Sequence, residues 1–262
     1  MIFFKNKKIL VAGGSGFFGS NITSKLIKLK SDVTASYFST KKRGKYYKRF
    51  NFLNMNECLK ATKKKDIVFL AVIKSSGIKN LENTFVNENL NNLNMLLNLI
   101  EACRINNVKK IIWISSSTIY QPLSKKISET QLNLNLDPYP VYHGVGWSYR
   151  YIEKVIWYYN LKFKMDIKIL RTASIYGPYD NFNLEKSHVV PSLIKKTLDK
   201  NKIINVWGSK KTVRDFVFID DLVQASLKFI QKSKINFPLN FNFGESTTIF
   251  NLTKIILKVA NK

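Results

Sequence analysis

The sequence predicts an α/β fold built on a doubly wound parallel sheet, and three observations carry this prediction. An apolar, strand-like run over 8–12 is followed by a glycine-rich turn, which leads into a helix-like run over 17–29. Further along, short apolar runs alternate with longer amphipathic ones, as in a parallel sheet covered by helices. The length of 262 residues and the hydrophobic fraction of 45% suit one large domain with a small appended lobe.

The individual elements follow from the spacing of apolar residues. Strands are predicted at 8–12, 32–37, 66–72, 110–115 and 167–171, and the apolar runs at 66–72 and 110–115 are expected to be buried parallel strands. Helical spacing relates Leu90, Leu93, Leu97 and Ile100, and the same spacing places Ile152, Ile156 and Tyr159 on one face of a helix over 146–163. Beyond residue 178 the pattern loosens, although 214–221 predicts a strand leading into a helix with Asp220 or Asp221 as N-cap.

The glycine-rich turn is the strongest functional signal in the chain. Its spacing, Gly13-x-x-Gly16-x-x-Gly19, lies between a strand and a helix, which is typical of a dinucleotide-binding element. One glycine permits the tight turn, one lets the backbone approach a pyrophosphate, and one lets the helix pack closely on the strand. The helix N-terminus would then present free N–H groups to the phosphates. The alternative is a purely structural turn.

The residues after the second strand favour NADP over NAD. An acidic residue at the carboxyl end of that strand would bind the ribose 2′-hydroxyl of NAD. From Ser20 to Asn56 the only carboxylate is Asp32, at the opposite end of the strand. Hydroxyls and cations that suit a 2′-phosphate occupy the far end instead: Ser36, Tyr37, Ser39, Lys41, Lys42 and Arg43. The alternative is that these cations belong to a generally lysine-rich surface, and NAD remains the alternative cofactor.

The net charge of +26 raises the question of nucleic-acid binding. Only six of the 43 basic residues are arginines, the residue preferred for bidentate phosphate and base contacts, and the lysines are spread along the chain. We therefore expect a solvated lysine surface and no nucleic-acid partner. No apolar run has the length of a bilayer span, and Cys58 and Cys103 have neither metal nor redox spacing, so no membrane partner, no metal and a cytoplasmic location are expected.

Several motifs together resemble the extended short-chain dehydrogenase/reductase (NAD-dependent epimerase/dehydratase) family, and within it the GDP-L-fucose synthase group. The resemblance covers nearly the whole chain and rests on the glycine turn, 115–120 (SSSTIY), 176–182 (YGPYDNF), 187–191 (SHVVP), 206–208 (VWG) and 214–216 (RDF). The tract over 176–191 is the most specific of these motifs. The resemblance implies a Rossmann domain over 1–178, with returns around 214–232 and 239–244. It implies a substrate lobe from 179–213 and 245–262, which we expect to be truncated relative to those relatives.

What the resemblance implies for function is a nucleotide-sugar epimerase/reductase. Enzymes of this kind epimerise a 4-keto-6-deoxy nucleotide sugar and then reduce its ketone with NADPH. Ser116 matches the family's catalytic serine and His188 its acid/base histidine, whereas Thr118 stands where a cysteine is expected. The resemblance also implies a homodimer formed by the two long helices.

The family's Tyr-x-x-x-Lys pair is absent from this sequence. Its positions hold Val145 and Tyr149. Valine cannot donate a proton, and loss of a positioned general acid typically lowers a rate by about 10²–10⁴. Tyr142 or Tyr149 could supply a phenol instead, and packing is the alternative role for both. A non-catalytic NAD(P)-binding paralogue is therefore the alternative to an enzyme.

The candidate site residues fall into three groups. Catalysis is assigned to Ser116, His188, Tyr142 and Tyr149. The cofactor is expected to contact Gly13, Gly16, Phe17, Phe18, Gly19, Ser39, Lys41, Arg43, Ala71 and Ser115. The nucleotide-sugar substrate is expected to contact Thr118, Asn181, Trp207 and Arg214; the alternative for Arg214 is pairing with Asp215 or Asp220.

Overall fold

The computed structural model describes residues 2–39, 44–73, 85–123, 127–199, 203–206, 209–232, 234–235 and 237–261. Within them, seven parallel strands form one sheet in the order β3-β2-β1-β4-β5-β6-β9. These strands are β1 (Lys8–Ala12), β2 (Asp32–Tyr37), β3 (Tyr47–Arg49), β4 (Ile67–Leu70), β5 (Lys110–Ser116), β6 (Ile167–Thr172) and β9 (Leu239–Phe241). The doubly wound parallel sheet predicted from the sequence is confirmed.

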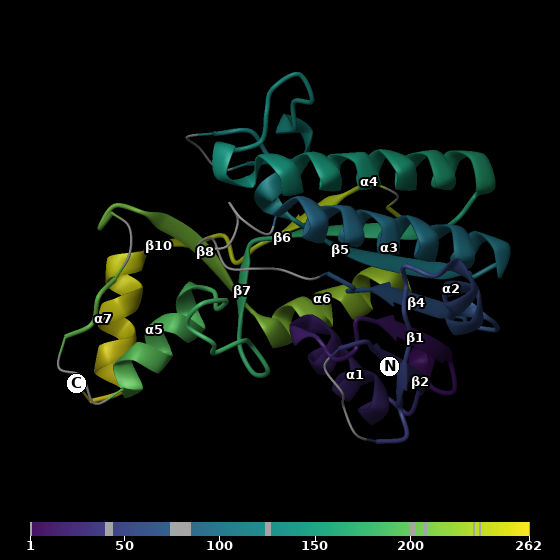
Figure 1. Cartoon of the computed structure of the whole chain (residues 1–262), viewed down its shortest axis with the longest axis horizontal. Helices are drawn as coiled ribbons and strands as arrows, with labels where there is room; N and C mark the ends of the chain where they lie inside the picture. The colour runs from purple at the N-terminus through teal and green to yellow at the C-terminus, as the bar shows by residue number, and fades with distance from the viewer. Residues whose placement is uncertain are drawn as a thin grey trace.

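Helices cover both faces of this sheet (Figure 1). On one face lie α2 (Met55–Thr62), α3 (Phe85–Ile105) and α4 (His143–Phe163), and on the other α1 (Phe17–Lys28) and α6 (Ile219–Lys232). Alternate residues of a strand point to opposite faces, so Val68 and Leu70 enter one core while Ile67 and Phe69 enter the other. This double burial explains why the β4 sequence is apolar at every position.

The helical faces agree in part with the sequence pattern. Ile152 and Ile156 of α4 are buried as predicted. In α3 the buried residues include Leu96 and Leu99, whereas Leu90 is half exposed. Ile100 is also buried, and Leu93 and Leu97 are partly buried against the same core, so the stripe predicted for α3 is present and only Leu90 departs from it.

A smaller lobe stands beside the carboxyl edge of the large sheet (Figure 1). Its three-stranded sheet has the order β10-β8-β7, with β8 parallel to β7 and antiparallel to β10. The lobe consists of β7 (Ser174–Tyr176), α5 (Val189–Leu198), β8 (Val213–Phe218), β10 (Ser246–Thr248) and α7 (Ile249–Val259).

The strand and helix predicted around 214–221 are present as β8 and α6. Asp220 and Asp221 are not the N-cap, because α6 begins at Ile219, directly after β8. Both carboxylates lie in the first turn, where they interact favourably with the helix dipole.

Cys58 and Cys103 are buried in the core between α2, α3 and the sheet. Burial raises the pKa of the Cys58 thiol to about 12, and it also raises the pKa of Cys103. Both side chains are therefore neutral, apolar core groups at physiological pH. None of the described helices combines the length and apolar character that crossing a bilayer requires.

Candidate functional site

The glycine turn lies at the carboxyl end of β1, between β2 and β4. Gly13 has a φ of +84°, and a Cβ on it would lie 2.3 Å from the carbonyl oxygen of Ala71, just after β4. A Cβ on Gly19 would lie 2.0 Å from the carbonyl oxygen of Gly13. Glycine is required at both positions, because the turn packs directly on α1 and on β4.

Ser36 of β2 fixes the other side of the turn. The Gly13 N–H donates to Ser36 Oγ over 2.7 Å, and the Ser15 N–H donates to the Ser36 carbonyl oxygen over 3.1 Å. The turn thus occupies the point where the strand order reverses, between β2-β1 and β4, and doubly wound folds bind ligands in the crevice at such a point.

The N-terminus of α1 follows the turn without a side-chain cap. Gly16 is the N-cap residue, and Phe17, Phe18 and Gly19 form the first helical turn. The Phe18 side chain is buried in the core, so the helix is anchored while its first amides remain at the crevice. Backbone N–H groups in this arrangement suit a pyrophosphate.

The residues predicted to contact the adenosine end of the cofactor lie at and beyond the end of β2, beside β3. Ser39 is exposed just beyond β2, while Lys41 and Arg43 lie outside the described residues. Asp32 pairs in register with Lys8 at the amino end of the strands, far from the turn. No described residue between 33 and 39 carries a carboxylate that could bind a ribose hydroxyl.

Residues 115–120 (SSSTIY), here called the serine segment, begin at the carboxyl end of β5, two strands from β1. Ser116 Oγ accepts the Thr118 N–H over 3.2 Å and so caps the 3-10 turn Ser117–Ile119. Ser115 is buried and its hydroxyl donates to Glu153 Oε1 over 3.1 Å. The Thr118 hydroxyl is buried and has no hydrogen-bond partner in the described part of the chain. Thr118 and Ser116 therefore lie together at the crevice edge of β5.

The residues of α4 that replace Tyr-x-x-x-Lys face the core. Val145 packs against the apolar cluster, and the Tyr149 ring meets Trp113 edge to face with centroids 5.3 Å apart. Burial raises the pKa of the Tyr149 phenol above its ordinary value. This placement favours the packing role for Tyr149. Tyr142 is half-buried at the start of α4, with its ring 6.4 Å from that of Tyr139.

A buried ion pair that was not predicted from the sequence contacts the serine segment through Ser115. Arg171 Nη2 lies 2.6 Å from Glu153 Oε2, and only 5% and 7% of the two side chains are exposed. Arg171 Nη1 donates to the Tyr120 hydroxyl over 2.7 Å, which donates in turn to Asn240 Oδ1 over 2.7 Å. This network joins α4, β5, β6 and β9. The one sign of this network in the sequence is Arg171, the last residue of the strand predicted over 167–171.

The tract over 176–191 runs from the end of β7 to the start of α5 and contacts α1. Asn21 of α1 donates to the Pro178 carbonyl oxygen over 2.8 Å. His188 is exposed at the N-cap position of α5. Asp180 was not singled out from the sequence, and burial raises the pKa of its carboxyl, which the Asn181 N–H and His188 partly oppose. Asn181 is exposed, and its side-chain oxygen accepts the Asn183 N–H over 2.9 Å.

Arg214 is exposed on β8 and donates to the Val213 carbonyl oxygen over 2.9 Å. Asp215 accepts hydrogen bonds from the Phe243 and Gly244 N–H groups, at 2.9 and 2.8 Å. Within the described residues, Arg214 and Asp215 therefore form no ion pair with each other. Trp207 lies outside the described residues.

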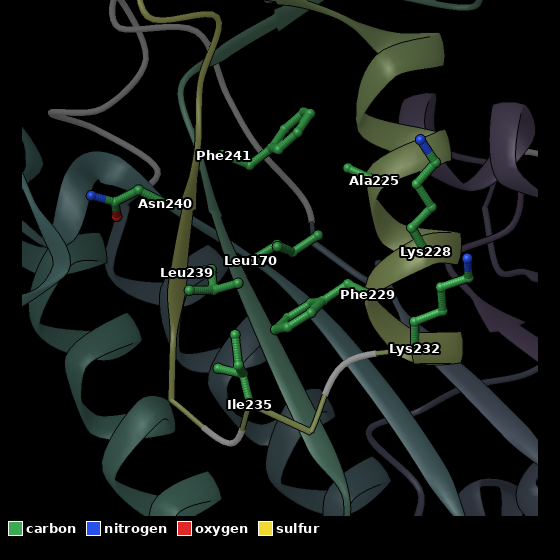
Figure 2. A pocket seen from close by; sticks show the side chains of 9 residues that line it. All are labelled: Leu170, Ala225, Lys228, Phe229, Lys232, Ile235, Leu239, Asn240 and Phe241. Carbon is green, nitrogen blue, oxygen red and sulfur yellow. The ribbon is translucent and has the colours of Figure 1, made fainter.

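A surface cavity of about 380 Å³ lies away from this crevice, between α6 and the edge strand β9. Figure 2 shows its apolar floor, with Phe229 facing Leu239 and the Lys228 and Lys232 side chains on the helix side. None of the predicted site residues lines it. The predicted site residues lie along the carboxyl edge of the sheet, and this cavity is not part of that site.

Comparison with known families gives a match over most of the chain. The model of the NAD dependent epimerase/dehydratase family matches residues 9–244. The GDP-mannose 3,5-epimerase of Arabidopsis thaliana is 26% identical over 267 residues, which cover 98% of this chain and 70% of that protein. The GDP-L-fucose synthase of Escherichia coli (strain K12) is 28% identical over 219 residues, 76% of this chain and 66% of that protein.

Solved structures share the same architecture. A UDP-glucose 4-epimerase of Thermotoga maritima, solved with UDP-glucose, superposes with a TM-score of 0.85 at 23% identity. The superposition covers 97% of this chain and 82% of that one. At this identity the likeness establishes the fold alone.

Proposed function

Because this chain belongs to the NAD dependent epimerase/dehydratase family, we propose that it binds NADP and acts on a 4-keto-deoxy nucleotide sugar, as an epimerase/reductase similar to GDP-L-fucose synthase. One observation supports the proposed binding of a dinucleotide. The glycine turn, closed by Ser36 and Ala71, leads without a side-chain cap into α1 at the switch point of the sheet. The backbone of Gly16 to Gly19 would hold the pyrophosphate. NAD remains the alternative dinucleotide.

The roles of the other residues follow from their positions along the crevice. When bound, NADPH supplies a hydride to a keto carbon. Ser116 Oγ would hold the keto oxygen by a hydrogen bond, with Thr118 beside it. His188 would exchange a proton with the sugar from the small lobe, and the Arg214 guanidinium would bind the diphosphate. Asn181 and Trp207 remain proposed substrate contacts.

A second candidate function rests on α4. With Val145 and the core-packed Tyr149 in place of the family's tyrosine and lysine, no lysine is positioned on α4 to lower the pKa of a catalytic phenol. This observation favours a non-catalytic NAD(P)-binding paralogue, such as a sensor or a subunit. Tyr142 stays the candidate proton donor for the catalytic case.

Two measurements on the purified protein distinguish these candidates. Titration with NADPH and NADH, followed by nucleotide fluorescence, is expected to show tighter binding of NADPH; tighter NADH binding would reverse the cofactor proposal. NADPH oxidation is then measured with GDP- and dTDP-linked 4-keto-6-deoxy sugars. Turnover that falls on Ser116→Ala supports the enzyme. Binding of NADPH without turnover favours the non-catalytic paralogue. Activity created by the double variant Val145→Tyr with Tyr149→Lys would support this interpretation further. Because Tyr149 is buried, thermal melts of the two single variants check that each still folds.

The exposed face of α4 supports a homodimer. Its aromatic and aliphatic side chains are unusually accessible for a helix, with 53% of Tyr151, 60% of Trp157 and 55% of Leu161 exposed. Large exposed apolar side chains gathered on one helix typically indicate a surface that contacts a partner. Sedimentation velocity is expected to give a dimer mass for the native chain and a monomer mass for Trp157→Glu. A native monomer would refute the dimer.

A further inference from the structure

The edge of the sheet beside the glycine turn includes Arg49 of β3, a cationic residue that was not among the site residues predicted from the sequence. Ser36, which contacts the turn directly, is paired in register with Lys48 of β3, and Tyr37 with Arg49. Neighbouring strands lie about 5 Å apart, so the Arg49 backbone is within about two strand spacings of the turn. A side chain as long as that of arginine spans this distance.

The Arg49 side chain is positioned by Phe38. Its guanidinium carbon lies 4.9 Å from the centroid of the Phe38 ring, which is 51% exposed just past the end of β2. Within the described residues, the ion pairs formed by arginines involve Arg104 and Arg171, and Arg49 takes part in none. The carboxyl end of β2 thus presents a guanidinium that contacts an aromatic ring and forms no ion pair with any carboxylate in the described part of the chain.

The chemistry of this edge suits a phosphate better than a ribose hydroxyl. A 2′-hydroxyl is normally bound by a carboxylate at the end of the second strand, and the segment 33–39 has none. The Ser36 hydroxyl accepts the Gly13 N–H, so it can still donate its own proton to a phosphate oxygen. A guanidinium binds two phosphate oxygens at once and remains charged at any physiological pH.

We propose that Arg49, held on the Phe38 ring, binds the 2′-phosphate of NADP and sets the preference for NADP over NAD. The inference rests on the proposed dinucleotide site and adds a residue of β3 to the residues predicted from the sequence, Ser39, Lys41 and Arg43. The contact with the Phe38 ring restricts the guanidinium before the phosphate binds, so less rotamer freedom is lost on binding.

The test compares NADPH and NADH binding to Arg49→Ala and to Lys48→Ala. Lys48 is the charge-matched control, because Lys48→Ala removes one positive charge from the neighbouring position of β3, on the face that Lys48 shares with Ser36 and not with Arg49. Arg49→Ala is expected to weaken NADPH binding about tenfold or more and to leave NADH binding within about twofold. Lys48→Ala is expected to change both by less than about threefold. Competition by 2′,5′-ADP against ADP gives the same readout without the nicotinamide.

Each outcome decides a separate claim. Equal weakening of NADPH and NADH by Arg49→Ala, or no change in either, overturns the role of Arg49 while the dinucleotide site stands. Equal NADPH losses in the Arg49 and Lys48 variants indicate general charge attraction and also overturn it. A native protein that binds neither nucleotide refutes the proposed function itself, and this inference with it. Phe38→Leu, which keeps the arginine but removes its platform, is expected to give an intermediate loss of NADPH affinity.

Discussion

Gly19→Ala is expected to weaken NADPH binding by about 100-fold and to lower the free energy of unfolding by about 3 kcal/mol. The new methyl group would lie 2.0 Å from the Gly13 carbonyl oxygen and 2.7 Å from its carbonyl carbon, which are backbone atoms with little freedom to move. The helix must therefore shift away from the turn. The amides that would bind the pyrophosphate shift with it, and losing two such hydrogen bonds accounts for the expected affinity change.

Gly244→Ala separates this local effect from general destabilisation. Gly244 has a φ of +92° with open space around it, so alanine there adds backbone strain of about 1–2 kcal/mol without a clash. It lies in the segment after β9, away from the turn, so NADPH affinity is expected to stay unchanged. Isothermal titration with NADPH and urea unfolding measure the two quantities. Native affinity in Gly19→Ala would contradict the assigned role of the turn.

Arg171→Met is expected to destabilise the fold by about 3–5 kcal/mol. The substitution leaves the Glu153 carboxylate buried with only the Ser115 hydroxyl, and it removes the donor to the Tyr120 hydroxyl. A buried charge without its counter-ion costs much more than the pair itself contributes, so the double variant Glu153→Leu with Arg171→Met is expected to recover part of the loss. Chemical denaturation of the single and double variants measures this coupling.

Arg104→Met provides the matched control for that experiment. Arg104 and Glu101 also approach to 2.6 Å, but about a third of each side chain is exposed. Solvent screens this pair, so its loss is expected to cost less than about 1 kcal/mol. Equal losses in the Arg171 and Arg104 variants would show that burial does not determine the energetics of the Glu153–Arg171 pair.

The parallel sheet and the glycine turn could be predicted because each depends on short-range patterns. The run Ile67–Leu70 is apolar at every position, and only glycine tolerates the backbone of Gly13. The environment of Tyr149 could not be predicted, because helical spacing places it near the site and only tertiary packing shows it against Trp113. Arg49 was missed for a similar reason: ten residues separate it from Ser39, and the pairing of β2 with β3 brings the two segments together.

The junctions between the two lobes restrict how the protein can close on a ligand. A single residue, Ala173, separates β6 of the large sheet from β7 of the small one, and β8 passes into α6 with no intervening residue. A Cβ on Gly177 would lie 2.5 Å from the Ile219 side chain, so the chain is tightly packed at this crossing. With two such short connections, the small lobe cannot swing as a hinged domain without bending β6 or tilting α6. We therefore expect adjustment to a ligand to come from the loops that line the crevice, while the angle between the lobes is set at folding.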